Sequence, residues 1–221
     1  MGEHKLEACI FDLDGVIVDT AQFHFLAWKK MAEKLGVDFD QKDNERLKGV
    51  SRMRSLEIIL EIGKKTLSKE EKEYWAGQKN EWFLTFVHRL KPGDIFPGIL
   101  DLLDALKKGG LKIGLASSSK NAGTILNLLG ITSRFDAIVD GTMIVKTKPD
   151  PEIFLLAAKR LGINPVHCVV LEDAEAGVEA ALAAGMKCVG IGSVENLPQA
   201  HWVLEETGDF TMELLSRLEA V

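Results

Sequence analysis

Several side chains in this sequence are of the types that bind and transfer phosphate, and they follow apolar segments at regular intervals. In chain order they are the pair Asp12 and Asp14, Ser117 at the head of a serine cluster, Lys148, and the pair Glu172 and Asp173. A carboxylate can attack phosphorus if nearby cations offset the like-charge repulsion. A second acid can then exchange a proton with the leaving or accepting oxygen. The pattern therefore indicates phosphoryl transfer.

A parallel β-sheet is the element most suited to position these residues. Apolar runs typical of buried strands occur at 8–13, 112–116, 166–171 and 187–191, and helical patterns lie between them at 99–108, 121–129, 151–161 and 174–184. Alternating strands and helices favour a parallel sheet with right-handed crossovers. Because ligands bind beyond the carboxyl ends of such strands, we expect the reactive side chains to converge on one edge.

The segment after the first strand breaks this rhythm. It has helical patterns at 23–35, 52–62 and 69–90, and Ser68 with Glu71 fits a capping box at the start of the third. The predicted fold is therefore α/β, with a Rossmann-like parallel core and a small inserted helical cap. We expect the core to comprise residues 1–20 plus 92–221, and the cap to comprise residues 21–91.

Four acidic side chains at one sheet edge would be costly to bury without a cation. Asp12, Asp14, Glu172 and Asp173 are oxygen ligands of the kind that Mg²⁺ prefers, so Mg²⁺ is the expected cofactor. Asp12 is the expected nucleophile and Asp14 the acid/base. Lys148 and Ser117 are expected to bind the oxygens of the transferring phosphoryl group.

Composition narrows the class of protein. The 221 residues are 46% hydrophobic with a formal net charge of -6, and they form no basic stripe that could bind nucleic acid. No window has the roughly 20 apolar residues that a membrane helix needs. Cys9, Cys168 and Cys188 lie in apolar runs and are expected to be buried thiols. We expect a cytoplasmic, monomeric protein whose partner is a small molecule.

The four signals resemble the haloacid dehalogenase (HAD) superfamily. They are D-x-D-G after an apolar strand, a serine at the next strand end, Lys-Pro before a helix, and a later Glu-Asp. The second acid, Asp14, resembles the acid/base residue that the phosphotransferase branch carries. The insertion follows the first strand, and in this it resembles the small helical cap of subclass I.

Within that superfamily the chain is most similar to the β-phosphoglucomutase family. The segments that carry this resemblance are FDLDGVIVDTAQFHFLAW, LKGVSR, QKN, ASSSKN, TKPDPEIF and LEDAEAG. It implies interconversion of β-glucose 1-phosphate and glucose 6-phosphate through an aspartyl-phosphate and β-glucose 1,6-bisphosphate. It also implies that Mg²⁺ is held by Asp12, the Asp14 carbonyl and Asp173, with Glu172 nearby or bound through water.

The resemblance assigns further residues to the substrate. Arg52 would bind the phosphate that is not transferred, and the remaining matched positions would orient the sugar or couple cap closure to Asp14. Those positions are Thr20, His24, Gly49, Lys79, Ser118 and Asn121. Simpler interpretations stay open: His24 as a packed core histidine, Lys79 as a surface lysine, and Glu172-Asp173 as a helix cap.

The sequence departs from the family pattern at two places. Ser118 stands where alanine is expected, and Asp140-Gly141-Thr142 stands where Asp-Pro is common; we expect the second to lie in a peripheral loop.

Two alternative functions stay open. They are a sugar-phosphate phosphatase of the same fold and a phosphate-sensing protein without catalysis.

Overall fold

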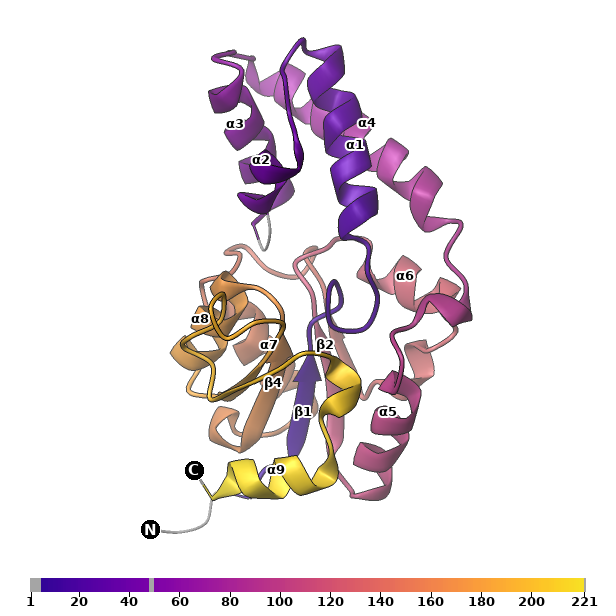
Figure 1. Ribbon diagram of the computed structural model, residues 1–221, viewed down its shortest axis with the longest axis vertical. Coiled ribbons are helices and arrows are strands. Elements are labelled where there is room, and N and C mark those ends of the chain that lie inside the picture. The colour runs from indigo at the N-terminus through magenta and orange to yellow at the C-terminus, as the bar shows by residue number, and fades with distance from the viewer. Residues whose placement is uncertain (1–4, 48–49, 221) are drawn as a thin grey trace. The chain divides into compact units, whose positions relative to one another are not determined.

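Strand β1 (Ala8–Phe11) lies at the centre of a six-stranded parallel sheet in the computed structural model, which describes residues 5–47 and 50–220 (Figure 1). The strand order is β3-β2-β1-β4-β5-β6. The order therefore reverses beside β1, between β2 and β4, and this is where open α/β sheets bind ligands.

The other strands are β2 (Lys112–Ala116), β3 (Ala137–Val139), β4 (Cys168–Glu172), β5 (Lys187–Ile191) and β6 (Trp202–Leu204). All four strands expected from the sequence are present, which confirms the α/β class. The two edge strands, β3 and β6, were not predicted. Each is three residues long, which is too short to show a hydrophobic period.

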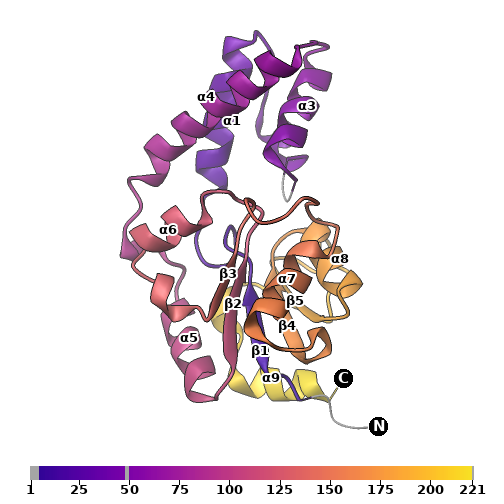
Figure 2. The ribbon, with the colours of Figure 1, turned by 180° about the vertical axis from the view of Figure 1, so that it is seen from behind.

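Helices cover both faces of the sheet (Figures 1 and 2). Helices α7 (Glu152–Leu161) and α8 (Glu175–Ala183) pack on one face, where their apolar residues join Ala8, Ile10 and Val170 in a buried cluster. Helices α5 (Ile99–Lys108) and α6 (Ala122–Leu128) lie on the other side. Helix α9 (Met212–Glu219) ends this unit, and Lys187 at the start of β5 bonds to its Leu218 carbonyl.

The helical insertion forms a second unit. Its helices are α1 (Ala21–Lys34), α2 (Gln41–Glu45), α3 (Arg52–Ile62) and α4 (Lys69–Val87). Their buried residues include Trp28, Met31, Leu56 and Ile59. The capping box expected at the start of α4 is present: the Glu71 N–H donates to Ser68 Oγ, and the Ser68 N–H donates to Glu71 Oε2.

The two units comprise Met1–Asp19 with Lys91–Val221, and Thr20–Leu90. These bounds lie one residue from the predicted division. None of the described helices combines the length and the apolar character needed to cross a bilayer. The three cysteines are buried free thiols, as expected.

Candidate active site

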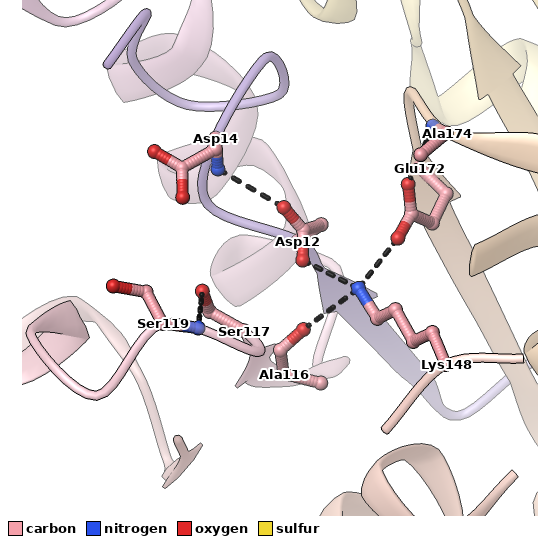
Figure 3. Close-up of polar contacts among 8 residues, drawn as sticks. All are labelled: Asp12, Asp14, Ala116, Ser117, Ser119, Lys148, Glu172 and Ala174. Carbon is pink, nitrogen blue, oxygen red and sulfur yellow. Dashed lines mark hydrogen bonds and ion pairs between the residues drawn. The ribbon is translucent and has the colours of Figure 1, made fainter. Parts of the chain in front are cut away.

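Lys148 contacts three strand ends at the switch point of the sheet (Figure 3). Its ammonium donates to Asp12 Oδ1 at 2.5 Å, to Glu172 Oε1, and more weakly to the Ala116 carbonyl oxygen at 3.4 Å. Asp12 directly follows β1, Glu172 ends β4, and Ala116 ends β2. The sheet therefore gathers Asp12, Glu172 and Lys148 as the sequence predicts.

The turn after β1 fixes the orientation of the Asp12 carboxylate. The Asp14 N–H donates to Asp12 Oδ2 at 3.0 Å, so both Asp12 oxygens have a partner. Each carboxylate oxygen still has a second lone pair, and one of these could attack phosphorus. Figure 3 shows the Asp14 carboxylate turned away from the Lys148 ammonium.

Asp173 lies against the same turn. Gly15 has a φ of +79°, which favours glycine, and an ideal Cβ on it would lie 2.5 Å from Asp173 Cγ and closer still to Oδ2. Only glycine leaves room there for the Asp173 carboxylate. The D-x-D-G and Glu-Asp motifs therefore meet at one place.

Burial strongly affects the charges of these groups. Burial raises the pKa of Asp12 to about 7, with Lys148 lowering it and Glu172 and Asp14 raising it further. Burial, Glu172 and Asp12 likewise raise the pKa of Asp173. Although burial disfavours the Lys148 ammonium, the carboxylates of Asp12 and Glu172 outweigh that effect and raise its pKa. One ammonium is thus set among several carboxylates that disfavour one another's ionisation.

This excess of carboxylate over cation fits a divalent metal ion. Among the residues that the structure describes, no three His, Cys, Asp or Glu side chains are already arranged as ligands of one metal ion. Mg²⁺ does not require such a cage, because it is commonly bound by one or two carboxylates with water or ligand oxygens completing the shell. The donor set of Asp12, Asp14 and Asp173 is compatible with it.

The serine loop after β2 continues the same sheet edge. The Ser117 N–H donates to the Val139 carbonyl at 3.0 Å, and Ser117 Oγ accepts from the Ser119 N–H at 3.2 Å. Ser118 Oγ is buried and has no hydrogen-bond partner within the described protein. Because an unpaired buried hydroxyl is costly, a ligand oxygen at Ser118 would be favourable. Asn121 is the N-cap residue of α6.

The loop at 140–142 is not peripheral, and that expectation was wrong. The Gly141 N–H donates to the Ser119 carbonyl at 3.2 Å, and an ideal Cβ on Gly141 would lie 3.0 Å from Ser118 C and closer to its oxygen. Both departures from the family pattern therefore contact each other. This contact could not be predicted from the sequence, because β3, the strand that precedes the loop, is only three residues long.

In the helical unit, His24 and Lys79 form a hydrogen-bonded pair, in which Lys79 is buried and His24 is partly buried. Lys79 is 2% exposed, and its Nζ lies 2.8 Å from His24 Nδ1 and 4.6 Å from the centre of the Trp28 ring. An ammonium can only donate, so Nδ1 accepts and His24 is neutral. Burial, then Lys79 and Arg52, lower the pKa of His24. The interpretation of Lys79 as a surface residue is excluded, whereas His24 is indeed packed, against Phe83.

Arg52 begins helix α3 in the same unit. Its Nη2 donates to Asn80 Oδ1 at 2.8 Å, and burial lowers its pKa. Thr20, the N-cap residue of α1, is fully buried. Gly49, also assigned to the substrate, lies outside the described residues.

The helix-cap interpretation of Glu172 is partly right. Glu172 Oε2 accepts from the Ala174 N–H at 2.8 Å, at the start of α8, while Oε1 accepts from Lys148. One carboxylate therefore serves the helix and the site together.

Comparisons with known proteins agree with this geometry. Residues 6–185 match the family model of haloacid dehalogenase-like hydrolases. The chain is 49% identical to the beta-phosphoglucomutase of Bacillus subtilis over 212 residues, covering 95% of this chain and 94% of the relative. It is 34% identical to the phosphorylated carbohydrates phosphatase of Thermotoga maritima, covering 90% and 91%.

A solved structure of a beta-phosphoglucomutase also matches the chain over nearly its whole length. The crystal structure of beta-phosphoglucomutase from Clostridium difficile matches with a TM-score of 0.94 and 47% identity, covering 97% of each chain. The chain therefore belongs to the haloacid dehalogenase-like hydrolase family and, within it, to the β-phosphoglucomutases.

Proposed function

We propose that this protein is a β-phosphoglucomutase that interconverts β-glucose 1-phosphate and glucose 6-phosphate. The observation that carries the proposal is the 49% identity to the Bacillus subtilis enzyme over nearly the whole chain. The buried Asp12–Lys148–Glu172 arrangement supports it, because it holds a carboxylate with free lone pairs at the switch point of the sheet.

In the proposed reaction an oxygen of Asp12 attacks a phosphorus atom of the bound 1,6-bisphosphate. The new bond joins Asp12 to phosphorus, and the bond from phosphorus to the sugar oxygen breaks. Asp14 gives a proton to the departing sugar oxygen, and in the reverse step it takes a proton from the attacking hydroxyl. The aspartyl-phosphate then passes its phosphoryl group to the 6-hydroxyl of β-glucose 1-phosphate, so that the bond from Asp12 to phosphorus breaks and the 1,6-bisphosphate forms. After the bisphosphate turns round, Asp12 attacks its 1-phosphate, glucose 6-phosphate leaves, and the aspartyl-phosphate is restored.

Lys148 is the proposed ligand of an oxygen of the transferring phosphoryl group. It already contacts the Asp12 carboxylate, so an oxygen of the transferring phosphoryl group at Asp12 would lie within reach of the same ammonium. Ser117 is the proposed donor to another phosphoryl oxygen. Its hydroxyl accepts from the Ser119 N–H and so keeps its own proton available for donation.

The proposed cofactor is Mg²⁺, held by Asp12, Asp173 and the backbone of Asp14, with Glu172 nearby. When bound, it would reduce the repulsion between the carboxylate and the phosphoryl oxygens. Burial and neighbouring carboxylates raise the pKa values of Asp12 and Asp173, and this supports the assignment, because a cation bound beside them would offset both effects.

The substrate assignments outside this cluster are also proposals. Arg52 is assigned to the phosphate that is not transferred, because a guanidinium binds phosphate in a bidentate manner. Residues assigned to orienting the sugar phosphate are Thr20, His24, Gly49, Lys79, Ser118 and Asn121. We expect a cytoplasmic monomer, as the sequence predicts.

A sugar-phosphate phosphatase is the second candidate, because relatives at 34% identity carry that activity in their names. They are the Thermotoga maritima phosphatase and the fructose-1-phosphate phosphatase of Escherichia coli. In such an enzyme, water rather than a sugar hydroxyl would accept the phosphoryl group from Asp12.

One assay separates the two functions. The protein is supplied with Mg²⁺, β-glucose 1-phosphate and a trace of the 1,6-bisphosphate, and glucose 6-phosphate and inorganic phosphate are measured together. A mutase gives glucose 6-phosphate with little inorganic phosphate. Stoichiometric release of inorganic phosphate without glucose 6-phosphate would select the phosphatase.

A further inference from the structure

The carboxylate of Glu172 is held from two sides. Oε1 accepts from the Lys148 ammonium, and Oε2 accepts from the Ala174 N–H at 2.8 Å. The residue is 1% exposed. Moving this carboxylate would therefore leave a buried ammonium with one carboxylate fewer and the partly buried Ala174 N–H without this partner.

A glycine on α8 makes this position possible. An ideal Cβ on Gly177 would lie 2.6 Å from Glu172 Cγ and closer still to Cδ and Oε1. The carboxylate thus lies directly over the Gly177 α-carbon, and any side chain at this position would displace it. The end of a free glutamate could move at little cost, but both oxygens of Glu172 are engaged.

The backbone does not require glycine at this point. Gly177 lies in the first turn of α8, and its φ is not in the left-handed region. Alanine has the higher helix propensity by roughly 1 kcal/mol, so local structure alone favours alanine at 177. The close approach of Glu172 is the feature that opposes it.

We propose that Gly177 is a positioning residue of the active site: its lack of a side chain admits the Glu172 carboxylate, which in turn sets the Lys148 ammonium against Asp12. The effect on catalysis rests on the proposed function, whereas the effect on the carboxylate does not. Lys148 is the connection between the two, because it donates to both Asp12 and Glu172.

Gly123 provides a matched control. It too lies in the first turn of a helix, α6, that follows a strand end of the same sheet edge. No atom lies within 4 Å of an ideal Cβ on Gly123. Gly123→Ala therefore tests helix propensity alone, and Gly177→Ala tests propensity together with displacement of Glu172.

The first test uses the metal-free protein and no substrate. Gly123→Ala should leave the Tm unchanged or raise it, whereas Gly177→Ala should lower it by about 4 °C or more, as overpacking of a buried site does. Hydrogen exchange at the Ala174 amide, measured by NMR, should accelerate in Gly177→Ala and not in Gly123→Ala. In a Glu172→Ala background, which removes the obstructing carboxylate, Gly177→Ala should no longer lower the Tm.

The second test measures turnover. Gly177→Ala should lower kcat about tenfold or more with a smaller change in KM, because a displaced ammonium misplaces the reacting groups. If the wild-type protein is not a mutase, hydrolysis of a small phosphate ester replaces the mutase assay, and the metal-free measurements are unaffected. The proposal is overturned if Gly177→Ala matches Gly123→Ala in Tm and in Ala174 exchange. Unchanged kcat in a Gly177→Ala protein with accelerated Ala174 exchange would overturn the catalytic part.

Discussion

Lys79 donates from its ammonium to the neutral imidazole of His24 at 2.8 Å, in a place where Lys79 is 2% exposed. The contact is a hydrogen bond between a cation and a neutral acceptor, so protonation of His24 would place two positive charges beside each other. The rings of Trp28 and Phe83 flank the ammonium at 4.6 and 4.7 Å and attract it. The hydrogen bond between Lys79 and His24 is therefore expected to weaken when His24 is protonated.

We predict that His24 makes the protein less stable in acid. Its pKa in the folded state is lowered by burial, Lys79 and Arg52, from an ordinary value of 6.5. The unfolded chain binds this proton first, so the stability due to neutral His24 is present above about pH 6.5 and is lost as pH falls below it. Urea unfolding of His24→Asn, which keeps an acceptor for Lys79, should show a smaller loss between pH 7.5 and 5.5.

His88 provides the control for that measurement. It is exposed at the end of α4, so His88→Asn should follow the wild-type pH dependence. An equal pH dependence in His24→Asn and wild type would contradict the role of His24.

Asp12→Asn should abolish turnover, because an amide cannot form the acyl-phosphate. We expect activity to fall by at least about 10⁴-fold, as is usual when the nucleophile of a covalent mechanism is removed. The measurement is glucose 6-phosphate formation at saturating Mg²⁺. Activity within tenfold of wild type would eliminate Asp12 as the nucleophile.

The same substitution should change how the metal-free protein responds to pH. Burial raises the pKa of Asp12 from 3.8 to about 7, so the folded protein binds this proton more tightly than the unfolded chain does. The stability that results is fully present below pH 3.8 and is lost as pH rises through about 7. Between pH 5.5 and 8, wild type should therefore lose more stability than Asp12→Asn in urea unfolding with chelator.

Asp38→Asn is the matched control, because Asp38 is exposed. This variant should behave as wild type at both pH values. If Asp12→Asn behaved in the same way as Asp38→Asn, the buried carboxylate would not be the source of the pH dependence.

Much of this site could be predicted from the sequence, because its residues follow strands with clear apolar runs. Asp12, Ser117 and Glu172 come at or directly after the ends of such runs, and a parallel sheet brings those ends together. The burial of Lys79 could not be predicted, because it depends on rings that α1 and α4 supply at the same point. The role of Gly177 was also missed, since a glycine in a helix gives no signal of what lies above it.

Removal of the metal should stop the reaction without unfolding the protein. Lys148 already bonds to Asp12 and Glu172 in the structure, so part of the negative charge is balanced without a metal ion. We expect a chelator to abolish turnover, Mg²⁺ to restore it, and circular dichroism to remain unchanged throughout. Turnover that persists in excess chelator would rule out the proposed cofactor.

Arg52 and Arg54 allow the last assignment to be tested within one helix. Arg52 is partly buried and donates to Asn80 at 2.8 Å, whereas Arg54 is exposed and pairs with Glu57 and Glu61. Arg52→Ala should lower mutase kcat/KM about tenfold or more, since hydrogen bonds to charged groups contribute about 1.5–3 kcal/mol. Arg54→Ala should stay within about twofold, because exposed ion pairs contribute little. Hydrolysis of a phosphate ester that lacks a second phosphate should be nearly equal in both variants, because the group assigned to Arg52 is absent from that substrate. Equal losses of Arg52→Ala in the two assays would show that Arg52 acts on the fold or on the transferring phosphoryl group rather than on the second phosphate.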